Sequence, residues 1–240
     1  MEKQFLRTAM IIGENSIEKL NKSHVAVFGV GGVGSFVAEA LARAGVGHID
    51  LFDDDVVSES NINRQLIALH STIGEHKTEI MKKRILDINP NANVNAINCF
   101  YTAENADKYD LSVYDFVVDA IDTVTSKILL ITRFRDCGTP IISSMGTGNK
   151  LHPEMLEISD IYKTSVCPLA RVMRRELKKY NIKKLPVLYS KEEPITPNSY
   201  ENDTVGSTHP KRSVPGSISF VPSAGGLIIA GYVIRELIKN

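Results

Sequence analysis

Hydrophobic and polar positions alternate along residues 1–146 in blocks that predict strands and helices in turn. Short runs predict strands at residues 25–30, 48–52, 114–121 and 140–144, and alternation of polar and apolar residues predicts one at 94–100. Apolar positions at helical spacing predict short segments within residues 2–21, then helices at 34–44, 77–88 and from about 122 to 137. This order favours an α/β fold: a Rossmann-like, doubly wound, mainly parallel sheet with helices on both faces.

The pattern changes after Gly146. Residues 155–158 and 217–221 predict strands that extend the sheet, and residues 168–180 and 225–238 predict helices. Residues 191–216 carry four prolines among polar residues and predict a long mobile loop. Because no clean linker interrupts the chain, we expect one domain over 1–240. It comprises a helical segment (1–23), a nucleotide-binding core (24–146) and a substrate-side part (147–240).

Composition favours a cellular compartment but indicates no class of ligand. The chain has 28 Lys+Arg and 28 Asp+Glu, so net charge predicts no class of ligand. Three separated cysteines form neither a CxxC pair nor an even-numbered framework, which fits a reducing compartment. The N-terminus lacks a signal-peptide layout, and the apolar stretch 225–234 is too short to span a bilayer. These features favour a cytoplasmic protein with no membrane contact.

A glycine motif follows the first predicted strand. Gly29, Gly31, Gly32 and Gly34 precede a helix, which is the arrangement that lets a backbone approach a phosphate at a helix N-terminus. Asp53 ends the second predicted strand, where an acidic residue binds a ribose, although Asp54 and Asp55 are neighbouring candidates. These residues suit NAD and ATP equally.

The next segment favours ATP. Its polar cluster comprises Asn61, Arg64, Gln65 and Lys77. A dehydrogenase needs no such cluster, whereas cleavage of ATP needs cations because charge moves onto the leaving pyrophosphate. Alternatively, Arg64 and Lys77 are ordinary surface charges with no ligand. At the end of another predicted strand lie Asp119 and Asp122, and a carboxylate there suits Mg²⁺. Alternatively, Asp119 caps the following helix or turn.

Taken in order, GxGGxG, DDD, SNINRQ, IGxxK and DxxD resemble the ubiquitin-activating-enzyme superfamily, with its ThiF-, MoeB- and HesA-like adenylyltransferases. The resemblance implies that ATP adenylates a carboxylate and pyrophosphate leaves. It implies that Asp53 binds the ribose, that Mg²⁺ binds Asp122, and that the phosphates meet Asn61, Arg64 and Lys77. The four motif glycines and Asp119 complete the implied ATP site. Arg7 matches an arginine supplied to the partner's site, which implies a homodimer; a surface ion pair is the alternative.

The C-terminal third resembles one branch of that superfamily. "DIYKTSVCPLARVMRRELKKYNIKK" and "GSISFVPSAGGLIIAGYVI" are similar to the tRNA threonylcarbamoyladenosine dehydratases, the TcdA or CsdL branch. This implies ATP-dependent cyclisation of that tRNA nucleoside, with AMP and pyrophosphate released. Many members have an aspartate where this chain has Cys167. Cys167 is also the one candidate thiol of this third, although a small residue at a helix start explains it as well.

A basic stripe independently favours a nucleic-acid substrate. On a helix over 168–180, one face carries five cations: Arg171, Arg174, Arg175, Lys178 and Lys179. Leu169, Met173, Leu177 and Tyr180 fall on the opposite, apolar face. Such a stripe suits phosphates, although a solvated helix face is the ordinary explanation of a lone stripe.

Three other functions remain open. A sulfur-carrier adenylyltransferase would use a ubiquitin-like protein substrate and a sulfur-transfer partner, but the paired CxxC motifs common in that class are missing. An NAD-dependent oxidoreductase would leave the cationic cluster unused. A tRNA-binding scaffold without activity would leave the nucleotide residues unexplained.

Overall fold

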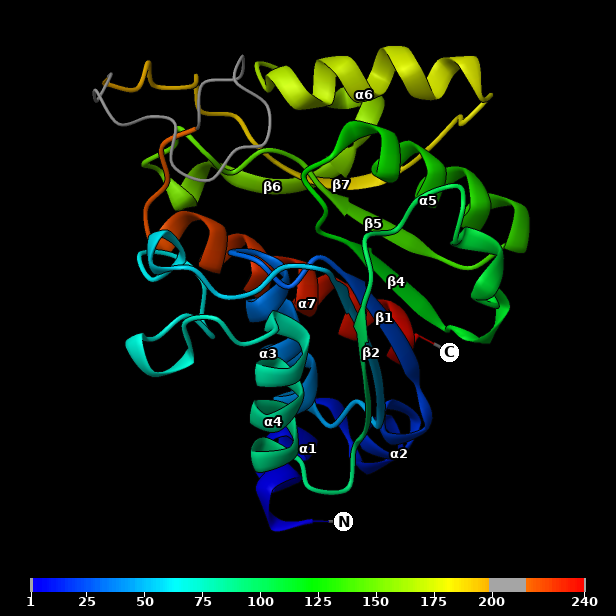
Figure 1. Ribbon diagram of the computed structural model, residues 1–240. Helices are drawn as coiled ribbons and strands as arrows, with labels where there is room; N and C mark the ends of the chain where they lie inside the picture. The colour runs from blue at the N-terminus through cyan, green and yellow to red at the C-terminus, as the bar shows by residue number, and fades with distance from the viewer. Residues whose placement is uncertain (1, 199–214, 240) are drawn as a thin grey trace.

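The computed structural model describes residues 2–198 and 215–239, and Figure 1 shows a twisted sheet with helices packed on both sides. Seven strands form this sheet in the order β3-β2-β1-β4-β5-β7-β6. The strands are β1 (His24–Phe28), β2 (His48–Asp53), β3 (Asn93–Asn98), β4 (Phe116–Asp119), β5 (Ile141–Ser144), β6 (Leu156–Asp160) and β7 (Pro186–Ser190). All neighbours pair in parallel except β6 and β7, which pair antiparallel. The predicted Rossmann-like fold, with a sheet extended by the C-terminal part, is therefore confirmed.

The strand order has a switch point beside β1. The chain moves outward from β1 to β2 and β3, then crosses back to β4 on the other side of β1. Loops that leave β1 and β4 therefore diverge, and in open α/β sheets this is where ligands bind. The carboxyl ends of β1, β2 and β4 all face this crevice, because these strands are parallel.

The helices divide between the two faces of the sheet. They are α1 (Leu6–Ile12), α2 (Glu14–Lys22), α3 (Gly34–Ala44), α4 (Lys77–Ile88), α5 (Val124–Cys137), α6 (Pro168–Lys179) and α7 (Phe220–Ile238). One continuous core joins the sheet to α2, α3, α4 and α7. On the other face, α5 and α6 pack over two further clusters of buried side chains. Strand residues alternate between these cores, as a sheet buried on both faces requires.

Helix α7 approaches the crevice from the C-terminal end of the chain. A Cβ on Gly226 would lie 2.5 Å from the Val33 carbonyl oxygen, so glycine allows α7 to touch the α3 backbone. Near its first turn, Pro222 lies 3.3 Å from where a Cβ of Gly32 would be. The C-terminal third thus contributes to the wall of the crevice.

Two sequence-based predictions in this third are wrong. Residues 217–221 form no strand, because α7 already begins at Phe220 and Ser219 is its N-cap. A short apolar run fits a strand and a helix start equally well. Strand β7 lies between the predicted helix 168–180 and the predicted loop 191–216, where no element was expected. Of the predicted loop 191–216, residues 191–198 have no helix or strand, and residues 199–214 lie outside the described residues.

Helix α7 is also longer than the apolar stretch expected there. By length and composition, its 19 residues meet the criteria for a membrane span, with a mean hydropathy of 1.4, so the stretch is not too short for one. In this fold, however, Val221, Ile229 and Val233 are fully buried in the sheet core. Core helices of soluble proteins satisfy the same criteria.

Candidate active site

The glycine motif makes a turn that side chains would block. Gly29 follows β1 with a φ of +89°, and a Cβ there would lie 2.6 Å from the Ala120 carbonyl oxygen. A Cβ on Gly34 would lie 1.7 Å from the Gly29 carbonyl oxygen. Gly31 differs, because the nearest atom to its Cβ position is 3.8 Å away. Gly29 and Gly34 are therefore needed for the fold, whereas Gly31 leaves space beside the N-terminus of α3, where an anion is stabilised.

Asp53 reaches from the end of β2 over this turn. Its carboxylate accepts hydrogen bonds from the Val30 amide at 2.6 Å and the Asp55 amide at 2.9 Å. Asp54 and Asp55 are exposed, so Asp53 is the member of the acidic run that contacts the glycine turn. Burial raises the pKa of Asp53 above its usual range, and the nearby charge of Lys77 opposes that shift.

Lys77 is a buried cation at the start of α4. Its Nζ lies 2.6 Å from an Asp55 oxygen and 3.8 Å from an Asp53 oxygen, and its side chain is 5% exposed. The backbone holds this position, because the Lys77 amide donates to the Asp55 carbonyl oxygen. Asp53 and Lys77, 24 residues apart in the chain, thus meet beside the glycine turn.

The segment between them supplies further polar groups. The Arg64 Cγ lies 3.5 Å from the Cβ position of Gly32, which places this side chain against the glycine turn. Its guanidinium donates to the Ser60 carbonyl oxygen and to Asn63 Oδ1, both at 2.9 Å, and burial lowers its pKa. No carboxylate of the described residues forms an ion pair with Arg64. The guanidinium therefore has donors to offer a phosphate.

Two amides lie in the same segment. Asn61 accepts a hydrogen bond from the Ser58 amide at 3.2 Å and so holds the local turn. Gln65 is 7% exposed, with Nε2 3.8 Å from the Cβ position of Gly31. Its Oε1 is buried without a hydrogen-bond partner among the described residues. The sequence placed Gln65 in the polar cluster without assigning it a role.

Asp119, predicted to contact ATP, lies in a buried cluster behind the turn. Its carboxylate is fully buried, 3.0 Å from Lys127 Nζ and 2.6 Å from Ser143 Oγ. It also accepts a 3.2 Å hydrogen bond from the Ile121 amide. Asp119 thus caps the turn that leads to Asp122, whereas the N-cap of α5 is Thr123. Sequence reasoning missed Lys127, because a lysine in a helix ordinarily indicates a surface.

Asp122 lies in the turn after β4 with an exposed side chain, and it accepts a 3.3 Å hydrogen bond from Thr123 Oγ1. It has no ion-pair partner among the described residues, so its oxygens suit a cation that also binds phosphates. Asp53, Asp54 and Asp55 have oxygens within 4.8 Å of one another on the other side of the crevice. The donor chemistry of Asp122 therefore fits Mg²⁺.

The glycine turn, the buried Asp53–Lys77 pair and Arg64 lie together as one polar cluster at the carboxyl edge of the sheet. A family model described as "ThiF family" matches residues 5–240. The chain belongs to the ThiF family. It is 46% identical to a tRNA threonylcarbamoyladenosine dehydratase of Bacillus subtilis, over 99% of this chain and 95% of that protein.

Solved structures give the same placement in the ThiF family. Those of Escherichia coli tRNA N6-threonylcarbamoyladenosine dehydratase, TcdA, in complex with AMP and with ATP match with TM-scores of 0.89 and 0.88. Each is 32% identical and covers 98% of this chain and 94% of that chain. The ThiF-type nucleotide fold therefore extends over nearly all of this sequence.

Arg7 lies far from the crevice of its own chain. It is exposed on α1, which follows Phe5, and Phe5 packs against Gly45 just before β2 begins. That contact is at the amino edge of the sheet, whereas the glycine turn is at the carboxyl edge (Figure 1). Arg7 forms no ion pair among the described residues. The alternative that it makes a surface ion pair within its own chain is therefore not supported by these residues.

Only some cations of the predicted basic stripe are exposed and without an ion-pair partner among the described residues. Arg171, Arg175 and Lys178 are exposed, as expected of an outer face. Arg174 is half-buried and donates to the Thr164 carbonyl oxygen at 3.0 Å and to its hydroxyl. Glu176 forms ion pairs with Arg175 at 3.0 Å and with Lys179 at 2.6 Å. Tyr180 was wrongly placed on the buried face and is 48% exposed, because the helix ends at Lys179.

Cys167 occupies the N-cap position of α6 and is 2% exposed. It packs in the same cluster as Met173 and Leu177 on the inner face of α6. A thiol is reactive when it is exposed to solvent and lies near positive charges. The burial of Cys167 therefore agrees with the interpretation of a small residue at a helix start.

Proposed function

We propose that this protein is an ATP-dependent tRNA threonylcarbamoyladenosine dehydratase that converts the nucleoside to its cyclic form. The observation that carries the proposal is the crevice at the carboxyl edge, where the glycine turn, Asp53 and Lys77 meet. It lies in a chain that matches enzymes of this name over nearly its whole length. The tRNA substrate and the cyclisation step come from those relatives and are part of the proposal.

The nucleotide lies across the glycine turn. Its ribose hydroxyls donate to Asp53, and its phosphates approach Gly31 and the N-terminus of α3. Arg64 supplies a planar pair of donors and Lys77 a point charge, while Asn61 and Gln65 offer amides. Asp119 acts indirectly, by holding the turn that carries Asp122.

Adenylation begins when the threonylcarbamoyl carboxylate attacks the α-phosphorus of ATP. The bond between the α-phosphorus and the oxygen that bridges to the β-phosphate breaks. Pyrophosphate leaves, and an acyl-adenylate is formed. Lys77 and Arg64 stabilise the charge that moves onto the leaving group. Mg²⁺ held by Asp122 would neutralise phosphate charge there.

Cyclisation follows on the same side chain. The carbamoyl group attacks the activated carbonyl and releases a proton to solvent as the ring closes, and AMP leaves with the oxygen that the carboxylate loses. Nucleophile and electrophile are already tethered, so the protein chiefly has to orient them and exclude water. No cysteine is needed, which agrees with the burial of Cys167.

A homodimer completes this proposal. Arg7 lies too far from its own crevice to act there, and the family resemblance gives it to the partner's site. A cytoplasmic location without membrane contact also remains part of the proposal.

Mass spectrometry of nucleosides tests the function. Threonylcarbamoylated tRNA is incubated with protein, Mg²⁺ and ATP, and the nucleoside is expected to lose one water, matched by formation of AMP. Omitting ATP and substituting Arg64→Ala are the controls. An unchanged nucleoside mass, with AMP formed only after a ubiquitin-like carrier protein is added, would instead establish the sulfur-carrier adenylyltransferase and bring back a sulfur-transfer partner.

A further inference from the structure

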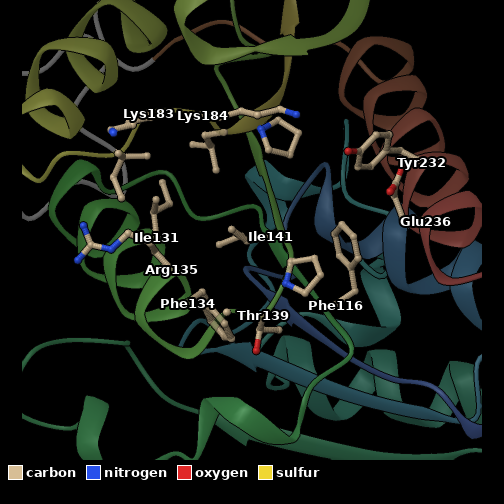
Figure 2. A pocket seen from close by; sticks show the side chains of 15 residues that line it. Phe116, Ile131, Phe134, Arg135, Thr139, Ile141, Lys183, Lys184, Tyr232 and Glu236 are labelled. Atoms are coloured by element: carbon tan, nitrogen blue, oxygen red, sulfur yellow. The ribbon is translucent and has the colours of Figure 1, made fainter. Parts of the chain in front are cut away.

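A second pocket lies at the opposite edge of the sheet from the nucleotide crevice. It has a volume of about 360 Å³ and opens where β4, β5 and β7 begin, at Phe116, Ile141 and Pro186. Figure 2 shows Phe134 and Ile131 of α5 on one side and Tyr232 of α7 on the other. This volume falls in the range of small-ligand sites.

The lining combines apolar rings with cations. The Phe116 and Tyr232 rings lie edge to face with their centroids 6.2 Å apart. Lys183 and Lys184 lie side by side along one rim, and Arg135 projects from α5 (Figure 2). An apolar floor with a cationic rim fits a flat apolar group that carries phosphate.

Little negative charge opposes these cations. Neither Lys183 nor Lys184 forms an ion pair within residues 2–198 and 215–239, and both are exposed. Glu236, the carboxylate of the lining, is paired with Lys239. Arg135 is paired with Asp136 at 2.6 Å. The pocket therefore presents two uncompensated positive charges beside an apolar surface.

Helix α6 runs from the carboxyl edge of the sheet, beside the end of β5, to this pocket. At the start of α6, Leu169 lies 3.9 Å from the Cβ position of Gly146, just beyond the carboxyl end of β5. At its end, the Tyr180 carbonyl oxygen accepts a 2.5 Å hydrogen bond from Arg135 of the pocket. The 12 residues of α6 span about 18 Å. Its exposed cations Arg171 and Lys178 lie along that path.

We propose that this pocket takes one unstacked nucleotide of the RNA substrate, while the RNA backbone follows α6 from the catalytic edge. The base packs against Tyr232 and the apolar floor, and its phosphates meet Lys183 and Lys184. Single-stranded RNA loops offer splayed bases that proteins stack on aromatic rings. This inference rests on the proposed function, because it takes the substrate to be a tRNA.

The test measures equilibrium binding of an unmodified tRNA transcript, without ATP, over a series of salt concentrations. Lys183→Ala/Lys184→Ala removes two phosphate contacts, and the slope of log Kd against log salt is expected to fall by about 2. Thr139→Trp fills the pocket from its rim without changing charge. It is expected to weaken binding about tenfold and leave the salt slope unchanged.

The matched control is Lys82→Ala/Lys83→Ala, an adjacent lysine pair on α4 at the other face of the sheet, which is expected to bind as the wild type does. ATP affinity and the melting temperature of each variant report on folding. Wild-type affinity in a folded Thr139→Trp variant would overturn the pocket while leaving the proposed function standing. A wild-type protein that binds neither this transcript nor threonylcarbamoylated tRNA would instead overturn the proposed function.

Discussion

Asp53 shows how burial tunes a single binding residue. Its carboxylate is fixed by two backbone amides, and burial raises its pKa above the ordinary value of about 4. The ionised form accepts hydrogen bonds from both ribose hydroxyls, whereas the protonated form loses acceptor capacity. Nucleotide binding should therefore begin to weaken at a higher pH than the titration of an exposed aspartate would give.

We predict that affinity for a non-hydrolysable ATP analogue weakens as the pH falls through this raised pKa. Calorimetric titration between about pH 7 and pH 4 measures the effect. Asp53→Asn should bind more weakly at neutral pH and lose the pH dependence. An analogue affinity that stays constant over this range in the wild type would contradict the role of Asp53.

The raised pKa of Asp53 affects the stability of the ligand-free protein in the opposite direction from ATP affinity. The folded state holds the proton on Asp53 more tightly than the unfolded chain does. The contribution of this group to the free energy of unfolding is therefore present at low pH and is lost as the pH rises through the raised pKa.

Lys127 shows what sequence reasoning cannot see at this scale. The sequence placed Asp53 at the end of one strand and Lys77 at the start of a helix, because strand ends and helix starts have recognisable signals. The ion pair of Lys127 with Asp119 has no such signal, since burial of a lysine depends on packing between distant segments. The sequence therefore placed Asp119 at the right strand end but could not reveal that its carboxylate is enclosed.

At the scale of elements, glycines in the turn between β1 and α3 have two different roles: one is required by the backbone, and the other leaves space for a ligand. Gly34 is needed by the backbone, because its Cβ position lies 1.7 Å from a carbonyl oxygen. Gly31 has room for a methyl group, so packing alone does not explain it. The space beside Gly31 is where a phosphate would lie.

We therefore predict opposite outcomes for two alanine substitutions. Gly34→Ala should lower stability or prevent folding, whereas Gly31→Ala should fold with a near-normal melting temperature and bind ATP about tenfold or more weakly. Thermal unfolding with and without ATP measures both quantities. Normal ATP affinity in Gly31→Ala would move the phosphates away from this turn.

The junction of β4 and α5 gives a second prediction. Lys127→Met leaves the fully buried Asp119 without its cation, and we expect a loss of about 3–5 kcal/mol in the free energy of unfolding. Lys83→Met breaks an exposed pair with Glu75 and should cost less than about 1 kcal/mol. Urea unfolding compares the two, and equal losses would show that the buried pair does not hold this junction together.

Prediction of elements worked best where strands and helices alternate. The strands and helices up to β5 were found within a few residues, since β1 and β4 are buried apolar runs, β3 alternates polar and apolar residues, and the helices follow an amphipathic pattern. The later part lacks that regularity. Strand β7 follows a lysine-rich turn, and the start of α7 resembles a strand, so tertiary packing decides both.

At the scale of the whole molecule, α1 presents a surface that the single chain leaves uncovered. Leu6, Met10 and Ile11 are 42%, 83% and 86% exposed, beside Arg7 on the same short helix. Soluble chains rarely expose such apolar groups together without a partner. The proposed dimer covers this helix and carries Arg7 to the other subunit's crevice.

Complementation between two inactive variants tests that arrangement. Arg7→Ala and Lys77→Ala should each abolish adenylation, because each removes one charge from every site. In a mixed dimer, one crevice combines the intact Lys77 of one subunit with the intact Arg7 of the other. Random pairing of equal amounts should therefore restore about a quarter of wild-type activity, measured as AMP formed with modified tRNA. A mixture no more active than the two variants alone would place Arg7 outside the partner's site, and the exposed face of α1 would need another explanation.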